Sequence, residues 1–239
     1  MKHTPNYDFK PIFLDFETNK SGQFYLVGVK SGDVFQQWVL TQDLIGLAKA
    51  KHLEMQKAED FALNILERMC EDNAVLVAYS SAELSIFNNL FDKNPLKKNF
   101  LESRYLNLLS ATKRWIRKHR KNDFEALPPF RLGADSYTQR RQRYSLASVM
   151  RLTSFHAEKD YAPGKTTSRF NSVISALRLK EQNFDNLTAV QKAKATKTLK
   201  HNEFDVKAMS VLFDLISKED ASCFRKSIVK LFDDTGSTK

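Results

Sequence analysis

The sequence predicts an α/β fold in which helices flank a mixed central sheet. Three segments rich in aromatic and β-branched residues come first, at 11–17, 24–30 and 34–40, with short connections between them. Segments with helical spacing of apolar residues then alternate with a short apolar run at 74–79. We therefore expect three antiparallel strands, followed by parallel strands that are connected by helices.

The first half of the chain supplies most of this sheet. The tripeptide SGD after residue 30 suits a hairpin turn between the second and third strands. Residues 42–72 show helical spacing, and AVLVAY at 74–79 suits a buried fourth strand. A helix with a serine N-cap is expected over residues 80–91.

The second half of the chain is more polar. RYLNLLS at 104–110 suits either a fifth strand or a helix. We expect an irregular basic excursion at 113–143 and then a short helix at 145–152 that is capped by Ser145. A polar insertion at 156–187 should contain one helical piece, around NSVISALRL. The pattern at 188–217 predicts a long helix, either continuous or broken in its middle, and residues 233–239 are expected to be a disordered tail. All of these belong to one domain that spans residues 1–239.

The composition is that of a globular protein. Hydrophobic residues make up 42% of the chain, and no run of about 18 apolar residues is present that could cross a membrane. Residues 1–10 lack the apolar core of a secretory signal. Cys70 and Cys223 have no metal-ligand spacing and are expected to be reduced and buried, which favours a cytoplasmic protein.

The net charge of +10 is concentrated in one segment. Residues 113–143 contain ten lysines and arginines against three acids, a net charge of +7. This pattern indicates a polyanionic partner, most often nucleic acid, although charge alone fits a solvated loop equally well. The cations expected to hold phosphates are Lys113, Arg114, Arg117, Lys118, Arg120, Lys121, Arg140, Arg141 and Arg143. Trp115, Tyr137 and Tyr144 are expected either to stack on bases or to pack the segment against the body.

Two carboxylates lie inside the first apolar segment, PIFLDFET. Asp15 and Glu17 are two residues apart, so in a strand they share one face at a separation of about 6–7 Å. The apolar residues around them indicate a central strand. A buried charge costs several kcal/mol unless something pairs with it, so these two acids require a partner.

A third acid, Glu83, begins an apolar helical face. It shares a stripe with Ile86, Phe87 and Leu90, which places its side chain toward the sheet. Ser80 lies three residues earlier, however, so Glu83 also fits a capping box that only closes the start of the helix.

A fourth acid, Asp205, likewise begins an apolar face, on the last long helical segment. It shares a stripe with Met209 and Leu212, and His201 lies one helical turn earlier on the same side. A histidine beside an inward carboxylate is a candidate general base, because its pKa is near neutrality.

A metal centre would account for four acids in such positions. Carboxylate oxygens bind Mg²⁺ or Mn²⁺, whose charge offsets the cost of burial. Two such ions about 3.5–4 Å apart stabilise the attacking and leaving oxygens of phosphoryl transfer. The metals would explain the acids, and a phosphodiester substrate would explain the basic segment.

These motifs resemble those of the DEDD superfamily of 3′–5′ exonucleases, which have a ribonuclease H-like fold. FLDFET is similar to the D-x-E motif on the first strand of that fold. VAYSSAELSIFNNL is similar to the second motif, in a branch that carries Glu there, and HNEFDVKAM is similar to the third motif on the last long helix. The histidine lies four residues before the aspartate, which is the spacing of the tyrosine subtype of the family.

The resemblance implies a metal-dependent nuclease with a ribonuclease H-like mixed sheet. Two Mg²⁺ or Mn²⁺ ions would be held by Asp15, Glu17, Glu83 and Asp205, and His201 would orient or deprotonate the attacking water. Thr18 and Asn19, just after the first motif, would seat the terminal nucleotide. We expect a 3′–5′ exonuclease on single-stranded DNA or RNA. The alternatives are a structure-selective endonuclease on the same fold and an inactive nucleic-acid-binding module.

Overall fold

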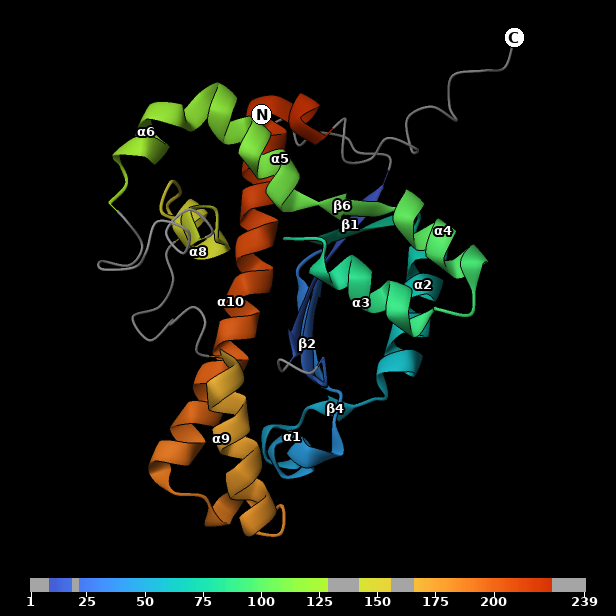
Figure 1. Ribbon diagram of the computed structural model, residues 1–239, viewed down its shortest axis with the longest axis vertical. Helices are drawn as coiled ribbons and strands as arrows, with labels where there is room; N and C mark the ends of the chain where they lie inside the picture. Colours follow the sequence, from blue (N-terminus) through green and yellow to red (C-terminus); the bar gives the residue numbers. More distant parts are fainter. Residues whose placement is uncertain (1–8, 19–21, 129–141, 156–165, 225–239) are drawn as a thin grey trace.

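A six-stranded mixed sheet lies between two layers of helices in the computed structural model (Figure 1). The structure describes residues 9–18, 22–128, 142–155 and 166–224. The prediction of an α/β fold with a mixed central sheet is therefore confirmed. No helix in these ranges is both long and apolar enough to cross a membrane.

The sheet has β1 near its centre. Its strand order is β4-β3-β2-β1-β5-β6, with β1 (Lys10–Thr18), β2 (Phe24–Ser31), β3 (Val34–Val39), β4 (Glu54–Met55), β5 (Ala74–Ala78) and β6 (Tyr105–Asn107). β1, β2 and β3 are antiparallel, whereas β5 and β6 run parallel to β1. The turn between β2 and β3 contains Gly32 at a φ of +56°, a conformation that glycine adopts without steric cost.

Nine α-helices flank the sheet within the described ranges. They are α1 (Ile45–Lys51), α2 (Ala58–Glu71), α3 (Ala82–Leu90), α4 (Pro95–Ser103), α5 (Leu108–Trp115), α6 (Lys121–Ala126), α8 (Leu146–Met150), α9 (Thr166–Leu179) and α10 (Ala189–Asp220), with a π-helical turn at Ile116–Arg120 and 3-10 turns at Gln42–Leu44, Phe184–Asn186 and Ala221–Phe224. Helices α2 and α3 pack on one face, and α10 crosses the other with α5, α8 and α9 beside it (Figure 1).

Alternation along β1 divides the core into these two layers. Ile12, Leu14 and Phe16 pack with α2 and α3. Phe13 points to the opposite side, where its ring meets that of Phe213 on α10 at a centroid distance of 5.6 Å. Residues of β1 that share the face of Phe13 therefore point toward α10.

Two segments differ from the sequence prediction. The region 42–72 is two helices separated by β4, because α1 ends at His52, which has a left-handed φ of 53°. The basic excursion at 113–143, expected to be irregular, is helical through residue 126. Helix α5, which leads into this segment, packs its buried stripe of Leu108, Ala111 and Trp115 toward α10, and the charges that follow the stripe hide it in the sequence.

The other predictions for single segments are confirmed at some positions and wrong at others. Residues 104–110 contain both alternatives, since β6 leads directly into α5. The helix capped by Ser145 is confirmed, and α10 is continuous over 32 residues without a break. The polar insertion contains α9, whose Phe170 and Val173 belong to the core. Both cysteines are free thiols, but Cys70 is exposed and only Cys223 is buried. The predicted tail at 233–239 lies outside the described residues.

Candidate metal centre

Two of the predicted ligands, Asp15 and Glu17, lie on β1 and share the face of Phe13 that α10 covers. β1 pairs with β5 only as far as Phe13, which lies opposite Val77. Beyond this point β5 ends and the chain turns into α3. The two carboxylates therefore lie where the sheet opens toward α3 on one side and α10 on the other.

Asp15 is held in place by Asn202 of α10. The side-chain amide of Asn202 donates to Asp15 Oδ2 at 2.9 Å and to the Asp15 backbone oxygen at 3.0 Å. Gln37 on β3 donates to Asn202 Oδ1 at 2.9 Å, which orients that amide. Gly28 lies opposite Asp15 in the sheet, and a Cβ atom there would be 2.2 Å from Asn202 Oδ1. Glycine thus leaves the space that Asn202 occupies.

The sequence analysis missed this supporting set of Asn202, Gln37 and Gly28. One usable signal is the glycine inside the apolar segment FYLVGVK, because a glycine within a strand often marks a close approach. Another is Asn202 itself, a polar residue four positions before the core residue Val206 on the same helical face.

Glu83 lies in the first turn of α3 and is buried. The Ser80 hydroxyl donates to Glu83 Oε2 at 3.3 Å, and the Ala82 amide donates to Ser80 Oγ at 3.1 Å. The N-cap residue is Ser81, and it makes no side-chain capping bond, so the Ser80–Glu83 pair is a local variant of the predicted capping box. Burial raises the pKa of Glu83 to about 7, although hydrogen bonds from Ser80 and from the backbone oppose this shift.

His201 and Asp205 on α10 complete the cluster. His201 Nε2 lies 3.3 Å from Asp205 Oδ2, and one potential ligand atom each from Glu17, His201 and Asp205 lies within 4.8 Å of the other two. Burial and then the positive charge of Arg169 lower the pKa of His201 to about 4. These two effects outweigh the neighbouring carboxylate, so the imidazole is neutral at pH 7.

The carboxylates of the cluster repel one another. Burial raises the pKa of Asp15 well above its usual value, and the charges of Glu17, Asp205 and Glu83 add to this effect. Burial likewise raises the pKa of Glu17, with contributions from Asp205 and Glu83. These mutual effects show that acids from β1, α3 and α10 lie near one another, although they are up to 190 residues apart in the chain.

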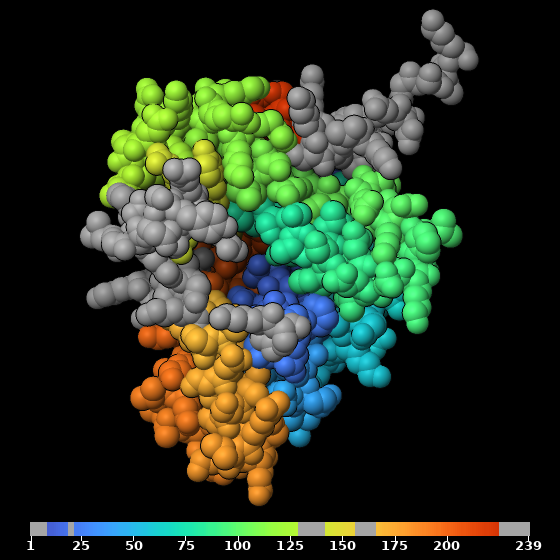
Figure 2. Space-filling model, in the orientation of Figure 1, coloured from blue at the N-terminus to red at the C-terminus, as the bar shows by residue number. Residues whose placement is uncertain are grey.

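The donor set suits a hard divalent cation. Within the described ranges, no lysine or arginine forms an ion pair with Asp15, Glu17 or Glu83. Such a group of oxygens is neutralised either by protons or by a bound cation, and carboxylate oxygens are ligands that Mg²⁺ and Mn²⁺ prefer. Figure 2 shows the surface hollowed in the middle of the molecule, with dark blue atoms of β1 and orange-red atoms of α10 inside the hollow.

The described cations of the basic segment form two sets. Arg114, Lys118 and Arg120 contact the end of α10 and the turn after it. Trp115 is fully buried and donates to Glu219 Oε2 at 2.8 Å, so it packs the segment against the body and cannot stack on a base. The second set, on the exposed side of the segment, is Lys113, Arg117, Lys121 and Arg143.

The structure describes only some of the other residues that were predicted to contact nucleic acid. Thr18 is the last residue of β1, and its backbone oxygen accepts a hydrogen bond from Thr167 at 3.2 Å. Asn19, Tyr137, Arg140 and Arg141 lie outside the described residues.

A second group of potential metal ligands consists of His119, Asp220 and Cys223. Its members already have partners: His119 Nε2 lies 2.9 Å from Asp220 Oδ2, and Lys118 donates to the same oxygen at 3.0 Å. These contacts tie the π-helical turn to the end of α10, and we interpret the group as structural.

No protein-family model matches this chain, and no curated protein sequence matches it either.

Proposed function

We propose that this protein is a metal-dependent nuclease with a ribonuclease H-like fold, acting as a 3′–5′ exonuclease on single-stranded DNA or RNA. The observation that carries the proposal is the convergence of Asp15, Glu17, Glu83 and Asp205 from three separate elements, with a neutral histidine among them. A sheet with three antiparallel strands followed by strands parallel to β1 is compatible with that fold. The exonuclease polarity rests on the resemblance of the three motifs to the DEDD superfamily.

In the proposed mechanism the four carboxylates would hold two Mg²⁺ or Mn²⁺ ions, which would supply positive charge for cleavage of the phosphodiester. Asn202 fixes the position of Asp15 from α10. His201 is neutral at pH 7 and can accept a hydrogen bond or a proton from the attacking water. His201 Nε2 lies 3.3 Å from Asp205 Oδ2, so this nitrogen is the one that faces the carboxylates and would accept the proton.

The test is cleavage of single strands labelled at the 3′ or the 5′ end, as DNA and as RNA, with Mg²⁺, with Mn²⁺ and with EDTA. Asp15→Asn should abolish the metal-dependent reaction, because it removes a ligand charge and keeps the shape. Glu203→Gln is the matched control: Glu203 is on α10 two residues before Asp205 but pairs with Lys207. The control should retain wild-type activity.

The products distinguish the possible outcomes. A ladder of shortened 5′-labelled strands supports a 3′–5′ exonuclease, whereas internal fragments indicate an endonuclease on the same fold. Strands that bind but stay intact with both metals contradict the nuclease proposal and favour the inactive binding module.

A further inference from the structure

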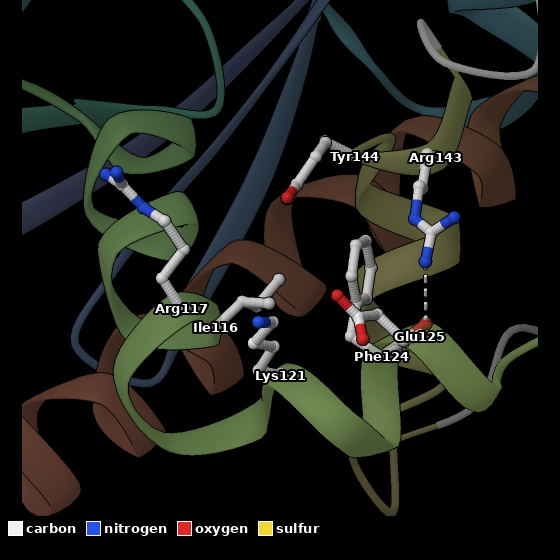
Figure 3. A pocket seen from close by; sticks show the side chains of 7 residues that line it. All are labelled: Ile116, Arg117, Lys121, Phe124, Glu125, Arg143 and Tyr144. Atoms are coloured by element: carbon white, nitrogen blue, oxygen red, sulfur yellow. Dashed lines mark hydrogen bonds between the residues drawn. The ribbon is translucent and has the colours of Figure 1, made fainter.

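A basic pocket lies between the π-helical turn, α6 and the segment that leads into α8. Its volume is about 460 Å³, and it is lined by Ile116, Arg117, Lys121, Phe124, Arg143 and Tyr144. Figure 3 shows Lys121 and Tyr144 extending toward the hollow from opposite sides, with Arg117 and Arg143 at its flanks. Glu125 also lines the pocket, so its described lining has three cations and one acid.

The three cations of this pocket are available to a ligand. Arg117, Lys121 and Arg143 are exposed, and none of them forms an ion pair with a described residue. Arg117 donates only to the backbone oxygen of Lys113 at 3.2 Å, and Arg143 donates to that of Phe124 at 3.5 Å. By contrast, the neighbouring cations Lys118 and Arg120 are bound by the carboxylates of α10.

Each of the two aromatic rings of the pocket lies beside a cation. The Arg143 guanidinium lies 5.1 Å from the centroid of the Phe124 ring, and the Lys113 ammonium lies 5.4 Å from that of Tyr144. The two rings pack against each other at a centroid distance of 4.8 Å. A nucleobase could stack on either ring only by displacing a cation, so this pocket suits an anion better than a base.

The pocket is close to the candidate metal centre. The Tyr79 hydroxyl donates to the backbone oxygen of Tyr144 at 2.6 Å. Tyr79 directly follows β5, and its pKa is raised by burial and further by the charge of Asp205. One side chain therefore connects the pocket wall with the carboxylate cluster.

We propose that this pocket binds backbone phosphates of a single nucleic-acid strand whose end lies at the carboxylate centre, and that it does so without reading the bases. This inference rests on the proposed nuclease function, because it assigns the pocket to the same substrate. A hollow of this volume is in the range of small-molecule sites and accommodates one nucleotide unit. Phosphate contacts fix the position of a strand and carry no sequence information.

The test compares two double variants of equal net charge. Arg117→Gln/Lys121→Gln removes two exposed cations of the pocket, and Lys49→Gln/Lys93→Gln removes two exposed cations elsewhere. Binding of a fluorescent single-stranded oligonucleotide is measured by anisotropy in EDTA over a range of salt concentrations. Each phosphate contact on a single strand contributes about 0.7 to the slope of log K against log salt. The pocket variant should lower that slope by about 1.4, whereas the control should leave it unchanged.

Cleavage of long and very short substrates provides the second measurement. The pocket variant should raise KM on long strands and leave kcat/KM unchanged on a dinucleotide too short to reach the pocket. Equal salt slopes for the two variants, or no strand binding by the wild type at low salt, would overturn the inference. If the pocket variant loses binding but the wild type cleaves nothing with either metal, the phosphate pocket stands and the nuclease proposal fails.

Discussion

His201 is the one residue of the cluster whose proposed role does not depend on holding a metal. Burial and the charge of Arg169 keep its imidazole neutral above about pH 4, although it lies beside Asp205. This state suits a group that accepts a proton or a hydrogen bond from water. Asp205, by contrast, is a proposed ligand, so the two residues should differ in what their substitution removes.

His201→Ala should lower kcat by about 10²–10⁴-fold, the usual contribution of a general base. It should leave Mn²⁺ binding, measured by calorimetry, within a few fold of wild type. Asp205→Asn should weaken Mn²⁺ binding as well as activity, because it removes a carboxylate from the centre. If His201→Ala abolishes metal binding too, the histidine is a ligand and not a base.

Gly28 sets the distance between β2 and α10. Gly28→Ala would place a methyl group 2.2 Å from Asn202 Oδ1, and the amide that holds Asp15 would have to move. We expect a loss of about 1–3 kcal/mol in the free energy of unfolding, as for other overpacked cores. Urea denaturation measures this value. In an Asn202→Ala background the same change should cost less, and additive costs would contradict the clash.

Among the elements, α5 and the π-helical turn show why charge is a poor guide to structure. The sequence at 113–143 is dominated by cations, prolines and one glycine, which predicts an irregular loop. Lysine, arginine and glutamate are also good helix formers, however, and one buried residue per turn is enough to fix a helix on a neighbour. Trp115 and Ile116 provide that contact with the core around α10.

Trp115→Ala should cost about 3–5 kcal/mol in the free energy of unfolding, because the side chain is fully buried. The loss should be present without any nucleic acid. Trp115→Phe keeps most of the buried ring and loses the bond to Glu219, so it should cost less. Chemical denaturation of both variants checks this. A Trp115→Ala variant as stable as wild type would mean that α5 is not anchored by this residue.

The carboxylate cluster shows what a sequence pattern can indicate about a site. Asp15, Glu17, Glu83 and Asp205 are predicted as one group because an acid on an apolar stripe is anomalous, and in the structure these acids lie near one another. Asn202 was missed because an amide carries no charge and its partners Gln37 and Asp15 are more than 160 residues away. Pairwise contacts over such distances depend on the packing of β1 against α10, which no local pattern encodes.

For the whole molecule, burial of the clustered acids links stability to pH, and for Asp15 and Glu17 the charges of neighbouring acids add to this effect. The pKa of Glu83 is about 7 in the folded chain against 4.5 as its ordinary value, and those of Asp15 and Glu17 are also raised. Between these values the folded state binds more protons than the unfolded state, so the free energy of unfolding falls as the pH rises. Without metal, the protein should therefore lose stability between about pH 4.5 and 7.

Metal should reverse this trend, because deprotonated carboxylates bind it best. At a concentration 100 times its dissociation constant, a ligand adds about 2.7 kcal/mol to the free energy of unfolding. For a chain of this size, that corresponds to a rise of roughly 5–10 °C in Tm. The Tm difference between Mn²⁺ and EDTA should grow from about pH 5 to about pH 8. Glu83→Gln should flatten the curve in EDTA. Identical pH curves with and without Mn²⁺ would contradict a metal centre at this position.

The continuity of α10 has a consequence for the newly synthesised protein. This helix is about 48 Å long and carries Asn202 and Asp205, whereas β1 and α3 come from the first 90 residues. A ribosome that has translated the first 200 codons therefore holds a chain with two walls of the centre and without the third. The carboxylate cluster can therefore form only after α10 has left the ribosome and docked on the sheet, which makes it one of the last features of the fold to be completed.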